Sequence, residues 1–225
     1  QIWSILLGFG IALAGYFIYC GIEGFTEKDR IVTAKGLSER EVLADKAVWN
    51  ITYNVTGNNL EYLYEAIPSK KEVIVRFFKA NGISEEEMVD APSTALDRST
   101  WYDWANKQHT MDRYELTGHM TIVSKDVEKL RQLQLKQLEL ARRGVVLDNS
   151  YISYEYTGLN GLKPEMVEEA TRNARVVAEK FAEDAGAKLG SIKSARQGQF
   201  EVYSDEVMPH LRKVRVVTTI EYFLK

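Results

Sequence analysis

Cysteine is nearly absent from this sequence, in which Cys20 is the single example. One cysteine excludes an intramolecular disulfide and a cysteine-based zinc site. Histidine is also scarce: the chain has only His109, His119 and His210, and none has an acidic residue at the spacing of a helical metal motif. We interpret the histidines as surface or packing residues, and we expect neither a metal site nor a cofactor.

Motifs of nucleophilic and nucleotide chemistry are missing too. The chain contains no Gly-x-Ser-x-Gly elbow, no P-loop and no dinucleotide fingerprint. The consecutive glutamates at 85–87 follow a predicted helix end, and such an acidic run is typical of a solvated surface. The sequence therefore predicts no catalytic residues and a protein that is not an enzyme.

Basic residues do not outnumber acidic ones. The chain has 29 lysines and arginines against 32 aspartates and glutamates, for a net charge of −3. No basic run is dense enough for a phosphate-binding face, so we expect no nucleic acid partner. With 45% hydrophobic and 27% charged residues, the composition is that of a globular protein with one large core or two modest ones.

Charge is absent from residues 2–22. These 21 residues, at about 1.5 Å rise each in a helix, are long enough to cross a bilayer core of roughly 30 Å. The run is too long for a signal-peptide core, and no small-residue cleavage site precedes Glu23. We predict an uncleaved transmembrane anchor over residues 1–25 that contacts the lipid bilayer through residues 2–22.

Small residues within this anchor are spaced by four positions, as in helices that pack closely in membranes. They form the pairs Gly8 with Ala12 and Gly10 with Ala14. These four residues are our candidates for transmembrane helix packing.

After the anchor, the pattern alternates between strands and helices. We expect strands at residues 30–37 and 45–56, joined as a hairpin, because apolar residues alternate through the second one. A helix capped by Asn58 or Asn59 should end at Gly82, and Pro68 should divide or kink it. Residues 84–112 lack a regular pattern, so they predict a long connection with a domain boundary within 90–112.

Strict alternation returns at residues 113–124, and a helix capped by Ser124 or Asp126 should follow to near Arg143. Further strands are expected at residues 151–157, 196–203 and 214–224.

The clearest helix lies within residues 159–192. We expect Pro164 at its first helical position and Gly186 at its end. One stripe of this helix is apolar and mostly small, which predicts close packing against a sheet: Val167, Ala170, Ala174, Val177, Ala178, Phe181 and Ala185. The opposite face is charged, and it could meet water or a neighbouring subunit.

These elements together predict an α+β fold. Its mixed or antiparallel sheets would be covered by helices in two lobes, at residues 30–110 and 111–225, after one N-terminal transmembrane helix.

Large aromatic residues gather in the irregular stretch at Trp101, Tyr102 and Trp104. Such side chains are enriched at interfaces, so one hypothesis is that they contact a neighbouring subunit or the membrane surface. The alternative is that they fix their own loop to the sheet.

Several segments resemble the SIMPL-domain family of bacterial cell-envelope proteins. The similar segments are 30–42, 44–49, 157–175, 181–192, 197–200 and 213–224, and together they represent residues 30–225. The chain is most similar to the membrane-anchored branch, found in Gram-negative bacteria.

This resemblance implies an α+β domain on the periplasmic side of the bacterial inner membrane, held there by a single span. It also implies a tendency to form large homo-oligomeric rings or channel-like assemblies, with no catalytic residues to carry over. Our first hypothesis is therefore a non-catalytic envelope scaffold or compartment whose partners are other copies of itself and, as a further candidate, an unidentified envelope protein. The second is an assembly whose lumen holds a small or lipidic ligand, and the third is a carboxylate-dependent hydrolase.

Overall fold

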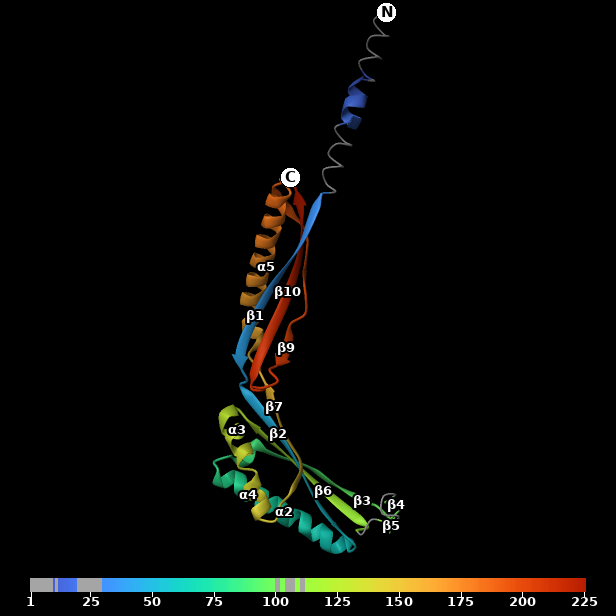
Figure 1. The fold of residues 1–225 in the computed structure, drawn as a ribbon, viewed down its shortest axis with the longest axis vertical. Coiled ribbons are helices and arrows are strands. Elements are labelled where there is room, and N and C mark those ends of the chain that lie inside the picture. Colours follow the sequence, from blue (N-terminus) through green and yellow to red (C-terminus); the bar gives the residue numbers. More distant parts are fainter. Residues whose placement is uncertain (1–9, 11, 20–29, 100–101, 104–107, 110–111) are drawn as a thin grey trace, which may run out of the picture. The chain divides into compact units, whose positions relative to one another are not determined.

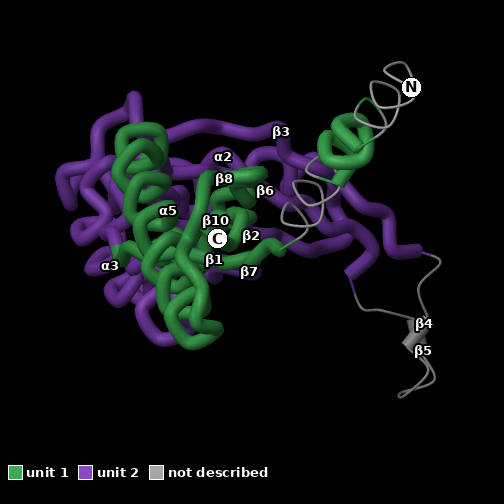
Figure 2. The backbone as a smooth tube through the Cα atoms, turned by 90° about the horizontal axis from the view of Figure 1, so that it is seen from above, with its two compact units in different colours: residues 1–41, 159–203, 213–225 green, residues 42–158, 204–212 purple. Residues whose placement is uncertain are grey.

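The computed structural model describes residues 10, 12–19, 30–99, 102–103, 108–109 and 112–225. They belong to two compact units (Figure 2). Unit 1 contains residues 1–41, 159–203 and 213–225, and unit 2 contains residues 42–158 and 204–212. The predicted boundary within 90–112 is wrong, because that stretch lies wholly inside unit 2. The lobes are not sequential because the first and last strands of the chain share one sheet.

Unit 2 is built on an antiparallel sheet in the order β3-β6-β2-β7 (Figure 1). The strands of this sheet are β2 (Lys46–Gly57), β3 (Met88–Asp97), β6 (Tyr114–Ser124) and β7 (Leu147–Glu155). A separate two-stranded sheet is formed by β4 (Tyr102–Asp103) and β5 (Gln108–His109). Its helices are α2 (Leu60–Ala80), the 3-10 turn η2 (Glu85–Glu87), α3 (Val127–Leu135) and α4 (Leu138–Arg142).

The alternating pattern in β2 places one side of this central strand in the core, as predicted. Ala47, Trp49, Ile51, Tyr53 and Val55 are all buried beneath the helices. The Trp49 ring packs edge-on against Phe78 with centroids 5.2 Å apart, and its indole Nε1 donates to Ser150 Oγ on β7 at 2.8 Å. This large apolar cluster is the main core of the protein.

The predicted helix caps of unit 2 are confirmed. Asn59 Oδ1 accepts from the backbone N of Tyr62 at 3.1 Å, and Asp126 Oδ1 accepts from that of Lys129 at 3.0 Å. Gly82 follows the end of α2 with φ +80°, a conformation that favours glycine.

Of the two outcomes predicted for Pro68, a division or a kink, the division is wrong, because α2 is continuous through this residue. Proline has no backbone N–H, so the helical hydrogen bond from residue 68 to the carbonyl of Tyr64 is missing. Pro68 and Tyr64 both lie on the exposed side of the helix, where water can bond that carbonyl. Ser69 Oγ donates to the carbonyl of Glu65 at 3.2 Å in the same turn. The helix therefore continues.

The long connection predicted at residues 84–112 contains a strand, β3, at the edge of the sheet. Pro92 lies at a register irregularity between Ala91 and Thr94, where a missing backbone donor is tolerated. Nearly all of β3 is exposed, so the sequence carries no apolar alternation there.

Two further predictions fail. β1 and β2 do not form a hairpin, because they belong to different sheets. The helix predicted to run to Arg143 is interrupted between α3 and α4, where Lys136 and Gln137 donate to carbonyls three residues earlier instead of four.

Unit 1 is built on the order β1-β10-β8, with β9 also paired to β10. Its strands are β1 (Ile31–Leu43), β8 (Leu189–Gln197), β9 (Glu201–Ser204) and β10 (Leu211–Leu224), and its helix is α5 (Leu159–Asp184). The strand predicted at residues 196–203 is in fact parts of two, β8 and β9. α5 runs beside β1 and β10 (Figure 1).

Close packing of α5 on the sheet is confirmed, although its register differs from the prediction. The buried residues recur every four positions: Met166, Ala170, Ala174, Ala178 and Ala182. Val177 and Phe181, predicted in the stripe, are exposed instead. The helix also begins at Leu159, before Pro164, and ends ahead of Gly186 with its φ of +65°.

At Gly36, β1 lies very close to the backbone of α5. A Cβ atom at Gly36 would lie 1.8 Å from the carbonyl O of Ala170 and 2.3 Å from the backbone N of Ala174. Because both are backbone atoms of a helix, neither can rotate away.

Residues 10 and 12–19 are helical. Within the described part of the chain, no helix combines the length and the apolar character needed to cross a membrane. The anchor predicted at residues 2–22 lies largely outside the described residues, as does Gly8.

We expect Gly36→Ala to lower the free energy of unfolding by roughly 1–3 kcal/mol or more, because the added methyl group pushes α5 off the sheet. The matched control is Gly161→Ala in α5, where a Cβ meets nothing within 4 Å. This control should leave stability unchanged or raise it by up to about 1 kcal/mol. Urea unfolding followed by circular dichroism measures both variants, and equal stabilities would contradict the packing described.

A second prediction concerns Glu87, which accepts from Ser124 Oγ at 2.5 Å and from the backbone N of Ser84 at 2.9 Å. Burial alone would raise its pKa, but these hydrogen bonds hold the pKa below its ordinary value of 4.5. A carboxylate whose pKa is lower in the folded state stabilises the fold at pH values above its pKa in the unfolded chain. This contribution is lost as the pH falls through the pKa of the folded state.

We therefore expect Glu87→Gln to cost roughly 1–2 kcal/mol of unfolding free energy at pH 7 and progressively less below the ordinary pKa of 4.5. Urea midpoints measured between pH 7 and pH 3 test this, with the exposed neighbour Glu86→Gln as the control. A deficit that is the same at every pH would argue against a role for the carboxylate charge.

Candidate functional site

The helix α5 has two flanks that differ in chemistry. On the β1 flank, hydrogen bonds fix the helix to the edge strand. On the β8 flank, the helix stops short of the strand and leaves a groove. The β8 flank is therefore the candidate binding site of unit 1.

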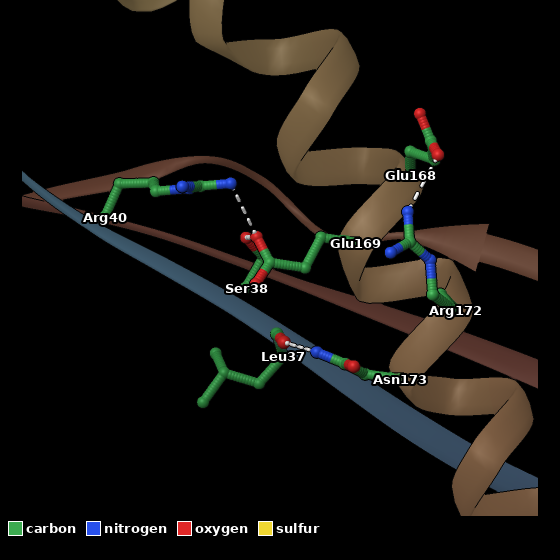
Figure 3. A network of polar contacts seen from close by, with 7 residues as sticks. All are labelled: Leu37, Ser38, Arg40, Glu168, Glu169, Arg172 and Asn173. Atoms are coloured by element: carbon green, nitrogen blue, oxygen red, sulfur yellow. Dashed lines mark hydrogen bonds and ion pairs between the residues drawn. The ribbon is translucent and has the colours of Figure 1, made fainter.

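The network on the β1 flank is centred on Glu169 (Figure 3). Its Oε2 accepts from the buried Ser38 Oγ at 2.9 Å and from an Arg40 guanidinium nitrogen at 3.1 Å. One turn further on, Asn173 Nδ2 donates to the backbone carbonyl of Leu37 at 2.8 Å. These bonds fix the position of the helix along β1, so this flank is structural.

The groove on the β8 flank has a volume of about 520 Å³. Its floor is apolar, with Tyr222 of β10 and Leu189 and Ile192 of β8. Its wall is the side of α5, and the remaining lining residues are Glu168, Thr171, Arg172, Arg175, Glu179, Gly190 and Ser191. A concave, mostly apolar surface with a charged rim is the common form of a binding site.

The charges on the groove wall neutralise one another. Glu168 Oε1 accepts from Arg172 at 2.8 Å, and Glu179 Oε1 accepts from Arg175 at 2.9 Å. Each pair joins residues four apart on the exposed side of the helix. The groove is thus suited to binding a neutral or mixed-charge partner rather than to concentrating charge for catalysis.

Unit 2 has a smaller apolar hollow of about 160 Å³ between α4 and β7. Leu138 and Val146 lie at its rim and are 75% and 64% exposed, over Ala141, Val145 and Leu147. On its polar side, Ser150 Oγ donates to Gln137 Oε1 at 2.7 Å and also accepts from the core Trp49. This hollow is the second candidate contact surface.

The aromatic cluster predicted as an interface is not placed by the structure. Trp101 and Trp104 lie outside the described residues, and of Tyr102 only its backbone, in β4, is described. Of the predicted membrane-packing residues, Gly10, Ala12 and Ala14 lie in the helical segment and are exposed. Neither prediction is tested.

The residues considered for chemistry lie apart. His119 Nδ1 is 3.5 Å from Thr52 Oγ1 on the sheet of unit 2, and His210 packs edge-on against Tyr154 with centroids 6.1 Å apart. Glu85 pairs with Lys79, and Glu87 caps η2. Across the described residues, no three His, Cys, Asp or Glu side chains gather in a way that would hold a metal ion.

Neither contact surface was identified from the sequence. The groove depends on Ile192, which lies in the part of β8 that was not predicted, and on its pairing with Tyr222. The hollow was missed because the break between α3 and α4, which Leu138 directly follows, was not predicted.

The comparisons with known proteins give a family and little more. A zebrafish (Danio rerio) protein, described as an interleukin-1 receptor-associated kinase 1-binding protein 1 homolog, is 20% identical over 175 residues, which are 78% of this chain and 65% of that protein. The chain thus spans slightly less than two thirds of this relative.

Solved structures give weaker likenesses. A hydrolase from Listeria innocua is 12% identical, with 84% of this chain and 92% of that chain covered and a TM-score of 0.25. An uncharacterised conserved protein from the same organism is 13% identical over 84% of this chain and 92% of that one, with a TM-score of 0.22. TM-scores this low support no conclusion about fold or activity.

Residues 32–220 match the SIMPL family, described as a protein of unknown function (DUF541). Within the described residues from 30 onward, this match includes every strand and helix apart from the ends of β1 and β10. The chain therefore belongs to the SIMPL family.

Proposed function

We propose that this chain is a membrane-anchored SIMPL protein whose folded units face the periplasm and assemble with other copies into a large, non-catalytic scaffold or compartment of the bacterial cell envelope. The anchor is residues 2–22, placed in the inner membrane as a single span. In this proposal the protein acts through its surfaces and not through a reacting centre.

The observation that carries the proposal is the apolar hollow of unit 2. Leu138 and Val146 are highly exposed apolar side chains beside a concave apolar surface. Such surfaces mark protein contact sites. Leu135, three residues before Leu138, is also a large apolar residue that is 76% exposed. Covering these side chains with another subunit would remove their apolar area from water.

The anchor rests on the uncharged stretch at residues 2–22. Gly10, Ala12 and Ala14 are exposed in the helical segment, and their small side chains would permit close contact between anchors of neighbouring subunits. Association within the membrane would then support association of the folded units.

A second candidate function is ligand binding, which the groove between α5 and β8 favours. Its apolar floor could hold a small or lipidic molecule. The paired charges on its wall favour binding over hydrolysis in either case.

The anchor predicts how the full chain partitions. Replacing both Ala12 and Ala14 by arginine places two charges in the bilayer core, at about 3 kcal/mol each, so we expect the protein to leave the membrane pellet for the soluble fraction. Replacing both by leucine is the control and should keep it in the membrane. Carbonate extraction and sedimentation measure the distribution, and wild-type protein in the soluble fraction would refute the anchor.

The assembly surface predicts a change in particle mass. We expect Leu138→Asp combined with Val146→Asp to reduce the mass of the detergent-extracted particle, because two carboxylates would be buried at the contact. Val89→Asp on β3, at a side chain 51% exposed, is the control and should leave the mass unchanged. Multi-angle light scattering gives the masses, and a wild-type particle of one chain would refute the assembly.

A further inference from the structure

The helix layer of unit 1 ends before the sheet does. α5 packs through Ala174 and Ala178 on Ala34 of β1 and on Ile220 and Tyr222 of β10. Ile192 of β8 pairs with Tyr222 and lies beside it on the same face, yet Ile192 is 54% exposed whereas Tyr222 is 4% exposed. Leu189 at the start of β8 still packs partly buried against this cluster, but at Ile192 the third strand lacks the cover that the first two have.

The dimensions of the gap suit a second helix. Neighbouring strands are about 4.8 Å apart, and packed helices are about 8–10 Å apart. A helix placed beside α5 would therefore lie over β8 and its outer edge. The lining residues of α5 extend from Glu168 to Glu179, about 17 Å or three turns of helix, which is long enough to hold a short amphipathic segment.

The charges select the kind of occupant. Arg172 and Arg175 are each neutralised by a glutamate on the same helix, so the wall has no net charge with which to attract a phosphate or an anionic lipid headgroup. The floor of Leu189, Ile192 and Tyr222 requires apolar side chains. A helix with an apolar stripe and both acidic and basic residues on its flanks satisfies both conditions.

Addition of an extended strand to β8 fits less well. The pairing of β8 with β10 has two register irregularities, which flank the pair of Ile192 with Tyr222. Lys193 and Arg196 also lie on this strand. Bulges and basic residues are features by which edge strands avoid pairing with other chains.

We propose that the groove between α5 and β8 is a docking site for an amphipathic helix of a second protein, which lies alongside α5 and completes the helix layer of unit 1. Its apolar stripe covers Ile192, Leu189 and Tyr222. Its charged flank exchanges ion pairs with Arg175 and Glu179. The contact is small, so the complex is weak and transient.

The test uses the full chain in nanodiscs of zwitterionic lipid and a fluorescein-labelled synthetic helix. The peptide has leucines at positions i, i+3, i+4 and i+7, with alternating glutamate and lysine on its flanks. Fluorescence anisotropy, corrected with empty nanodiscs, should show saturable binding in the micromolar range. Ile192→Asp places a charge at the centre of the floor and should weaken binding about tenfold or more.

The matched control is Phe181→Asp. Asn173 bonds to β1, and the stripe of α5 advances in steps of four, so Phe181, eight residues beyond Asn173, lies on the β1 flank. Phe181 is 57% exposed, a fraction similar to the 54% of Ile192, but it is not among the residues that line the groove. The Phe181→Asp variant should therefore bind the peptide as wild type does. Exchanging the pair, with Arg175→Glu and Glu179→Arg together, keeps the intrahelical bond and should shift preference to a peptide whose flank charges are exchanged.

Several results would overturn the proposal: no saturable binding, equal binding to Ile192→Asp, loss of binding in Phe181→Asp, or equal binding of a proline-containing peptide that cannot form a helix. Displacement of the bound peptide by palmitate would identify the groove as a lipid site instead. The same titration on the Leu138→Asp and Val146→Asp protein separates this site from subunit assembly. Peptide binding should persist there whatever the particle mass.

Discussion

The contact between α5 and β1 at Gly36 is the constraint on which unit 1 depends. The helix backbone approaches the strand so closely that a single Cβ atom would overlap the carbonyl of Ala170. Alanines every four residues from Ala170 to Ala182 allow this approach, and Ser38, Arg40 and Asn173 fix the position of the helix along the strand (Figure 3). Because small side chains bury little area, close contact and hydrogen bonds must supply what a larger core would.

This contact also creates the open groove. A helix held against β1 and β10 cannot cover β8 as well, because its diameter matches about two strands. In unit 2, the sheet of four strands is covered by three α-helices, α2, α3 and α4, with large aromatic residues in the core between them. In unit 2, uncovered apolar side chains lie at the rim of the hollow, where Leu138 and Val146 remain exposed. The groove of unit 1 and the hollow of unit 2 thus differ in size and in charge.

The periodic elements were the predictable ones. β2, β6, α5 and β10 carry strong apolar patterns because one side of each is fully buried, and the sequence predicted all four. β3 and all of β8 except its last two residues were missed because these are edge strands with mostly exposed residues, so burial leaves no pattern in them. The groove was missed with β8, since its floor is Ile192 on that strand.

The α+β class, the helix caps, the small-residue helix and the SIMPL family follow from the amino-acid sequence alone, because they depend on local patterns and on segments that can be compared one by one. The strand pairing, the division of the chain into two units and the places where apolar side chains stay uncovered could be learned only from the folded structure. Strand pairing joins β1 to β10 across almost the whole chain, and nothing in the local pattern of either strand specifies its partner. Exposure of Ile192 or Leu138 likewise depends on what lies opposite, which only the assembled fold determines.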